Sequence, residues 1–301
     1  MSALPRGLDD VAALAAAAPF VGLLLTIALA PLVAAHFWHR HYGKCATFWA
    51  LASLVPDVVR NGASAVLHEL TATALIEYLP FILLLGALFA VAGGLRLTGA
   101  PHGGPAVNTA MLALGAAMAS FIGTTGAAMV MIRPMIRANR HRRRTQHIFV
   151  FFILLVANAG GALTPLGDPP LFLGHLRGVP FFWPLAHLWA PTVLVAGGLL
   201  FLFHAIDQYV HRRGRDQDPP VLPEMEKLGV EGAVNLLLLA AVIAAVLLRS
   251  AWRPVATVTV LQVEWGIGEI ITDALLLGIG VLSLLLTEER VRRDNEFTWG
   301  P

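Results

Sequence analysis

Charge and cysteine are scarce in this sequence. Asp, Glu, Lys and Arg make up 13% of the residues, against 57% hydrophobic residues, a balance that is foreign to soluble domains. Cys45 is the single cysteine, which excludes an internal disulfide and argues against a metal–thiolate site. No Ser-His-Asp order, phosphate-binding loop or CxxC pair is present, so we expect neither an enzyme nor a bound cofactor. We also expect no cleavable signal peptide, because Asp9 and Asp10 precede a first apolar run that is a full span.

Long apolar runs dominate what is present. The runs reach about the 18 residues that span a bilayer, at 11–35, 70–95, 181–205, 232–248 and 267–287. The mean hydropathy is +0.71. The sequence therefore predicts an all-α polytopic membrane protein, placed in the bacterial inner membrane. The net charge of +2 comes from basic loops, which indicates membrane topology rather than nucleic-acid binding.

The apolar runs and their breaks predict an order of helices along the chain. The expected helices lie at 11–36, 44–60, 67–94, 105–137, 146–159, 169–176, 182–211, 231–249 and 266–287. Segment 212–230 is rich in charge and proline and is expected to be a cytoplasmic linker. It separates a first unit, residues 1–211, from two further membrane helices in residues 231–301.

The stretch 157–174 interrupts an apolar helix with glycines, prolines, Thr164 and Asp168. In hydrocarbon, freed backbone groups and carboxylates must find partners, so such a break survives only inside protein or beside a water-filled cavity. Broken helices of this kind form the binding sites of many secondary transporters. We therefore expect a broken helix over about 146–176, sheltered by a neighbouring segment.

Segment 105–137 has two short apolar limbs that meet at Gly123-Thr124-Thr125-Gly126. Each limb is too short to cross the roughly 30 Å bilayer core. A re-entrant hairpin with its tip near the midplane fits these lengths, and one long helix is the alternative. The basic run Arg137–Arg144 is expected to be cytoplasmic, but this placement is compatible with both.

Polar residues at the break and at the hairpin tip are the candidate cation ligands. Asp168 directly precedes two prolines and either caps the following helix or binds Na⁺ or a proton. Thr124 and Thr125 offer hydroxyl oxygens, which suit a hard cation, or cap the second limb. Asn158 and Thr164 bracket the break and either coordinate the ion or satisfy local backbone groups.

Further charged or polar residues lie within predicted helices. Glu77 lies inside the span 67–94, where a charged residue is a candidate proton carrier; the alternatives are a carboxylate at the interface or one paired with an arginine. Asn108 begins the hairpin and is interpreted as its cap. Glu269 and Asp273 lie four residues apart on one helix face, and the sequence does not give their partners.

Two long motifs resemble those of a known family. The run from Ala119 to Pro134 with its continuation to Arg140, and the run from Asn158 to Pro170, are similar to signatures of NhaD-type sodium:proton antiporters and related permeases. These belong to the ion transporter superfamily, which also includes arsenite, citrate and dicarboxylate permeases. The similarity covers residues 10–215 well and the remainder more weakly. Glu77-Tyr78-Leu79-Pro80 also resembles a pattern frequent in this family.

The resemblance implies proton-coupled Na⁺ or Li⁺ antiport by alternating access, with Na⁺ as the transported ion. It also implies two inverted repeats, each with a hairpin and a broken helix. Residues 1–211 match the first repeat. No second hairpin tip or second break follows residue 180, so the second repeat, or a partner chain, is expected to be missing. A homodimer is expected by family analogy. An anion permease and a non-transporting half remain as alternatives.

Overall fold

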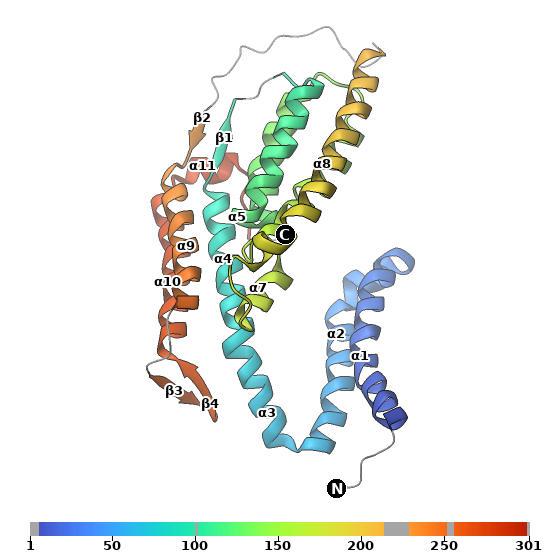
Figure 1. Ribbon diagram of the computed structural model, residues 1–301, viewed down its shortest axis with the longest axis vertical. Helices are drawn as coiled ribbons and strands as arrows, with labels where there is room; N and C mark the ends of the chain where they lie inside the picture. The colour runs from blue at the N-terminus through green and yellow to red at the C-terminus, as the bar shows by residue number, and fades with distance from the viewer. Residues whose placement is uncertain (1–5, 100–101, 214–228, 252–255, 300–301) are drawn as a thin grey trace. The chain divides into compact units, whose positions relative to one another are not determined.

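The computed structural model describes the backbone of residues 6–99, 102–213, 229–251 and 256–299. The chain forms two compact units, which we describe separately: one comprises residues 1–73 and 261–263, and the other residues 74–260 and 264–301. Both are mainly helical (Figure 1), and the short strands form two two-stranded sheets. This architecture confirms the predicted all-α polytopic fold.

The smaller unit contains three helices that follow one another almost without loops: α1 Arg6–Val33, α2 Ala35–Asn61 and α3 Ala63–Ala72. α1 and α2 pack against each other, and Trp49 Nε1 donates to Thr26 Oγ1 at 3.0 Å. Gly62, with φ +87°, separates α2 from α3, a backbone angle that favours glycine. The second helix was predicted to begin at residue 44, so the expected loop before it is wrong: those residues are helical.

The larger unit is built around α4 Leu79–Gly93. A π-helical turn, η1 Thr73–Tyr78, leads into α4 directly before Pro80, where proline has no N–H to give to a regular helix. α9 and α10 pack against α4 on one side, and α5, α6 and α8 form a second layer (Figure 1). Their bounds are α5 Pro105–Ala138, α6 Gln146–Leu155, α8 Trp183–Arg212, α9 Val234–Ala251 and α10 Ile267–Leu286.

Short elements complete the larger unit. β1 Arg96–Thr98 pairs antiparallel with β2 Gly229–Glu231, and β3 Thr257–Val260 pairs with β4 Val263–Gly266. α11 Glu289–Asp294 follows α10 and closes the C-terminal end of α4: Arg292 Nη1 donates to Ala90 O at 2.9 Å, and Asn295 Nδ2 donates to Gly93 O at 3.2 Å. These side chains satisfy carbonyls that a helix end leaves open.

α5 is a hairpin rather than one continuous helix. Its backbone reverses at Gly123, with φ +76° and ψ 155°, and its two ends meet, because Gly103 N donates to Ala138 O at 2.9 Å. A straight helix of 34 residues would hold its ends about 50 Å apart. The limbs before and after Gly123 rise only roughly 27 and 22 Å. α5 therefore folds back as the sequence predicts, with its two ends side by side, and the re-entrant placement of this hairpin in a membrane stays a prediction.

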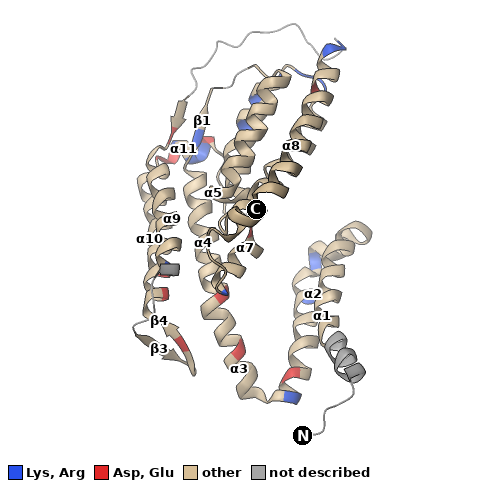
Figure 2. Ribbon diagram, viewed as in Figure 1, with Lys and Arg blue, Asp and Glu red and all other residues tan. Residues whose placement is uncertain are grey.

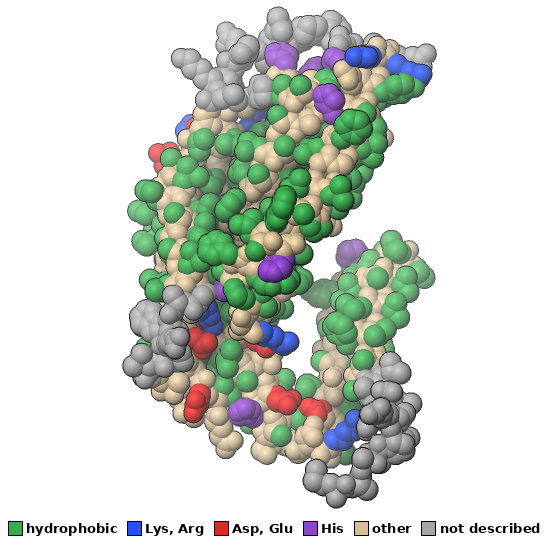
Figure 3. All heavy atoms as spheres, in the orientation of Figure 1, with side chains coloured by type: hydrophobic (Ala, Val, Ile, Leu, Met, Phe, Trp, Pro, Cys, Tyr) green, Lys and Arg blue, Asp and Glu red, His purple; other side chains and the backbone are tan. Residues whose placement is uncertain are grey.

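Among the described residues, six helices are long and apolar enough to cross a membrane, and α5 is counted as one of them by its length and composition. Because α5 doubles back, its two limbs do not make a single crossing. Figure 3 shows hydrophobic side chains over the helices of the larger unit, and Figure 2 shows Lys and Arg at the ends of α5 and α8. This distribution is that of an integral, multi-pass membrane protein.

The helices after residue 180 lie close to the predicted ranges. The described residues there form α8 to α11 and three of the short strands. Most of the predicted linker 212–230 lies outside the described residues. The absence of a second repeat, like the division into 1–211 and 231–301, stays a prediction.

Candidate functional site

The predicted helix break is present and is folded tightly on itself. α6 ends at Leu155, a 3-10 turn η2 covers Ala159–Leu163, and α7 covers Pro169–Leu176. A Cβ on Gly167 would lie 2.1 Å from Gly161 O, and one on Gly160 would lie 2.5 Å from Ala116 O. Only glycine permits these backbone approaches. These glycines therefore allow the backbone on the two sides of the break to pack against itself and against the first limb of α5.

The hairpin tip of α5 shelters the break, as predicted. Thr124 N donates to Gly167 O at 3.3 Å. Ser120 Oγ donates to Gly160 O at 2.5 Å, and the hydroxyl of Thr164 donates to Ser120 O. Backbone groups freed by the two irregular segments thus satisfy each other, which is what an apolar environment requires.

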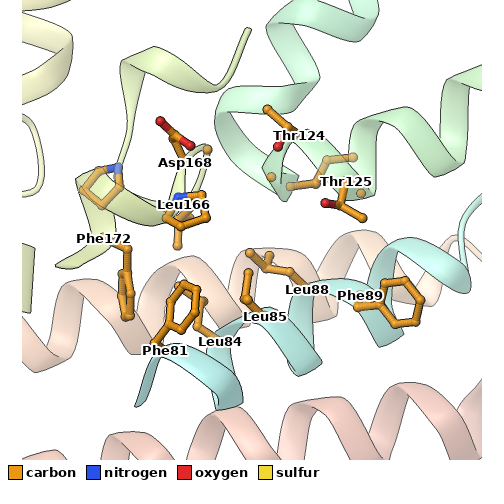
Figure 4. Close-up of a pocket in the computed structure, with 16 residues that line it drawn as sticks. Phe81, Leu84, Leu85, Leu88, Phe89, Thr124, Thr125, Leu166, Asp168 and Phe172 are labelled. Carbon is orange, nitrogen blue, oxygen red and sulfur yellow. The ribbon is translucent and has the colours of Figure 1, made fainter. Parts of the chain in front are cut away.

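A cavity of about 60 Å³ lies between the break, the hairpin tip and α4. This volume suits a few water molecules or a hydrated small ion, and it is far below the several hundred Å³ of drug-sized ligand sites. In Figure 4, Thr124, Thr125 and Asp168 lie on one side of the cavity, and apolar side chains of α4 and α7 lie on the other. Those apolar residues are Phe81, Leu84, Leu85, Leu88, Phe89 and Phe172.

Asp168 stands at the N-terminus of α7 but its side chain caps nothing. Its backbone carbonyl accepts from Leu171 N at 3.1 Å and from Phe172 N at 3.2 Å, whereas its carboxylate makes no capping hydrogen bond. The alternative interpretation of Asp168 as a side-chain cap is therefore wrong. The half-buried carboxylate lines the cavity with its oxygens unused by the residues that the structure describes.

Thr124 and Thr125 also line the cavity. Thr124 is half-buried and Thr125 is exposed, and neither hydroxyl hydrogen-bonds to a described residue. Thr125 accordingly does not cap the second limb of the hairpin. Two hydroxyl oxygens and one carboxylate thus come together from segments more than forty residues apart, and all of them retain the capacity to bind an ion.

The other three predicted site residues lie outside the cavity lining. Thr164 is buried, and its hydroxyl also accepts from Leu166 N at 3.2 Å, so it fixes the break. Asn158 is exposed before η2. Glu77 accepts two hydrogen bonds of 3.1 Å from the guanidinium of Arg177. The arginine-paired alternative for Glu77 is what the structure shows, and its role as a proton carrier gains no support.

A second polar network, which no local sequence pattern indicates, holds the base of the hairpin. Asp207 on α8 is fully buried and lies 2.6 Å from Arg142 Nη2 and 2.9 Å from His147 Nε2. Asn108 Nδ2 donates to Asp207 Oδ2 at 3.0 Å, and Asn108 and Asn139 exchange amide hydrogen bonds of 2.8 and 3.0 Å. Asn108 is therefore not a cap, because it ties the two ends of α5 together.

Comparison with known proteins identifies the family. A family model described as "Putative citrate transport" matches residues 10–301. The chain belongs to this family. No curated protein and no solved structure matches it. Membership places the chain among membrane transporters of the permease type, and it agrees with the resemblance at that level. The family model does not extend to the more specific resemblance to NhaD-type antiporters.

Proposed function

We propose that this chain carries the cation site of a secondary transporter that exchanges Na⁺ or Li⁺ for protons. The observation that carries the proposal is the Asp168 carboxylate, which makes no capping hydrogen bond. It lines a cavity together with Thr124 and Thr125, whose hydroxyls hydrogen-bond to no described residue. A carboxylate beside hydroxyl oxygens is a ligand set for a hard cation. The same carboxylate is able to hold a proton in place of the cation.

Charge favours a cation over a free anion at this site. A helix N-terminus such as that of α7 attracts anions, and Asp168 offsets this field with a negative charge. The described residues that line the cavity include no Lys, Arg or His. An anion entering the cavity would meet a carboxylate with no opposing positive side chain, whereas Na⁺ would be stabilised.

Exchange follows from competition at a single carboxylate. If Na⁺ and H⁺ bind Asp168 alternately and each is released on either side, the site couples their movements in opposite directions. Glu77 is not needed for this scheme, because it is engaged by Arg177. Alternating access then requires movement of α4, α5 and the break relative to one another or to a second repeat. That repeat would be supplied by a partner chain or by a homodimer in the bacterial inner membrane.

A second candidate is a citrate permease, which the description of the family favours. In that case Asp168 would bind the coupling cation, and the citrate would bind at a larger cavity formed in another state or with another part of the transporter. The cavity of about 60 Å³ holds an ion and water. The two candidates share the cation site and differ in what accompanies the cation.

Flux in vesicles tests the proposal. We expect an imposed Na⁺ gradient to drive proton movement through the reconstituted protein, and Asp168→Asn to abolish it. Glu289→Gln is the matched control, because Glu289 is 91% exposed on α11. Melting temperatures measured with added Na⁺ and with added citrate separate the candidates, since a ligand stabilises the state that binds it.

The outcomes are distinct. Sodium-driven flux that persists in Asp168→Asn would overturn the proposal. Stabilisation by Na⁺ that Asp168→Asn removes, without flux by the chain alone, would support the site and point to a non-transporting half. Citrate uptake that requires Na⁺ or a proton gradient would favour the permease.

A further inference from the structure

A further cluster of charged residues lies between α9 and α10, with Arg249 and Asp273 buried and Glu269 partly exposed. Arg249 Nη1 donates to Asp273 Oδ1 at 2.7 Å, and Arg249 Nη2 lies 3.7 Å from Glu269 Oε1. The side chains of Arg249 and Asp273 are 8% and 5% exposed, and that of Glu269 is 35% exposed. Glu269 and Asp273 lie four residues apart, so both face the same guanidinium.

The cluster has more negative than positive charge. Two carboxylates share one guanidinium, which leaves a net charge of −1 when all three groups are ionised. A net charge is costly in a buried site of low dielectric constant. Uptake of one proton by the pair of carboxylates would make the cluster neutral, because one ion pair and one neutral acid would remain.

An unused oxygen gives the proton a place to bind. Asp273 Oδ2 is buried and has no hydrogen-bond partner among the residues that the structure describes, and Arg249 Nη2 likewise lacks one there at hydrogen-bond distance. Buried polar atoms in native proteins nearly always have partners. When Asp273 is ionised, Oδ2 accepts no hydrogen bond. When the carboxyl group is protonated at Oδ2, that oxygen bears a hydrogen of its own and no longer carries an unpaired negative charge. A proton on Asp273 Oδ2 would therefore leave the hydrogen bond between Arg249 and Asp273 Oδ1 in place.

We propose that Asp273, Glu269 and Arg249 form a buried proton-binding site that holds one proton, separate from the cavity at Asp168. The proton is shared by the two carboxyl groups and belongs to the pair rather than to one residue. The neighbouring guanidinium disfavours a metal cation at the same place. Among the described residues, no group of three His, Cys, Asp and Glu side chains is arranged to hold a metal ion.

α7 connects this site to the cavity. His175, near the C-terminal end of α7, hydrogen-bonds to the backbone of Val246 on α9 and lies within electrostatic range of Arg249. Asp168 is at the other end of α7, which is about 12 Å long at 1.5 Å per residue. The charged groups that face Asp273 are thus Arg249 of α9 and Glu269 of α10, with His175 of α7 beside Arg249.

Infrared spectra of the reconstituted chain during a pH titration test the site. A protonated carboxyl group absorbs apart from a carboxylate, and among the titrating carboxyl bands we expect one that is lost in Asp273→Asn and in Glu269→Gln. Either variant leaves one carboxylate for Arg249, so no excess negative charge remains. Glu264→Gln is the control, because Glu264 on β4 is exposed, and it should keep the band. Glu269→Gln is the milder change and serves if Asp273→Asn does not fold.

Asp168→Asn separates this site from the cavity. The band should remain in that variant, and Na⁺ added at constant pH should not alter it. Absence of the band in the unmodified protein, or its persistence in both Asp273→Asn and Glu269→Gln, would overturn the inference. So would its loss in Asp168→Asn, which would place the proton in the cavity. None of these readouts depends on transport, so the failure of the proposed function would not affect them.

Discussion

Two aspartates in the larger unit have opposite surroundings. Asp207 is fully buried, and side-chain nitrogens of Arg142, His147 and Asn108 lie 2.6–3.0 Å from its carboxylate oxygens. Asp168 is half-buried beside a cavity, and its carboxylate makes no capping bond. Fully satisfied buried networks stabilise one structure, whereas an unsatisfied group retains its capacity to bind. The same side chain thus holds the fold in one place and remains available to a ligand in the other.

The two aspartates act on the same hairpin. The Asp207 network joins the two ends of α5 to α6 and α8, and Asp168 faces the tip of α5. A fixed base and a ligand-binding tip divide the hairpin into a stabilising part and a functional part. Substitutions at the base should therefore change the stability, and substitutions at the tip should change the binding.

The largest expected effect is that of Asp207→Ala on stability. This change leaves Arg142, whose side chain is 1% exposed, without its buried carboxylate, and breaking a buried ion pair costs about 3–5 kcal/mol. Thermal unfolding in detergent should show a large drop in melting temperature. Asp168→Ala is the comparison, and we expect its effect to stay within about 0.5 kcal/mol. Equal losses for the two variants would contradict the contrast between the sites.

Gly167→Ala should have the next largest effect. The added methyl group would meet the Gly161 carbonyl at 2.1 Å, so the break must shift, at a cost of about 1–3 kcal/mol. Gly197→Ala on α8 is the control, because apart from the nearby backbone of α8 itself no atom of the described residues lies within 4 Å of its added methyl group. Alanine also favours a helix by up to about 1 kcal/mol. Unfolding curves of both variants give the difference. An unchanged unfolding midpoint for Gly167→Ala would show that the backbone at Gly161 and Gly167 has room for a methyl group, contrary to this structure.

Two hydroxyl groups of α5, that of Thr125 at the hairpin tip and that of Ser120 in the first limb, separate ligand binding from stability. Ser120→Ala removes the hydrogen bond to Gly160 O and should lower stability by about 1 kcal/mol. Thr125→Val removes a hydroxyl that hydrogen-bonds to no described residue, so its stability should hardly change. The stabilisation by Na⁺ should instead fall in Thr125→Val and persist in Ser120→Ala. A reversed pattern would assign the ligand role to Ser120.

Local sequence features predicted most of the fold. Gly160, Gly161 and the prolines near Asp168 mark the break directly, because their effect on the backbone needs no distant partner. The hairpin follows from limb lengths on either side of Gly123. The second helix was misplaced at its start, since the polar and aromatic residues after Ala35 resemble a loop by composition although they continue a helix.

Contacts between distant residues could not be predicted. Glu77 and Arg177 are 100 residues apart, and Asn108 and Asp207 are 99 apart. A single sequence gives no pairing at these separations, so Asn108 was interpreted as a local cap and Asp207 received no role. The sequence brings Asp168, Thr124 and Thr125 together because two interruptions of apolar helices indicate one place, and the structure lines one cavity with all three. Asn158 and Thr164 are candidates because they bracket the break, and neither lines this cavity.

The smallest expected effect concerns an ion pair outside the membrane-spanning helices. The hydrogen bond from Arg96 holds the pKa of Glu231 on β2 below its usual value, and the charge of Arg290 acts in the same direction. A lowered pKa contributes stability above the pKa of the unfolded chain, about 4.5, and that contribution is lost as the pH falls below it. Glu231→Gln should therefore lower stability at pH 7 by less than about 1 kcal/mol and flatten the decline on acidification. Because this pair lies apart from both aspartates, the effect should add to that of Asp207→Ala; a strong coupling between the two would show that the hairpin base and the β1–β2 sheet unfold as one unit.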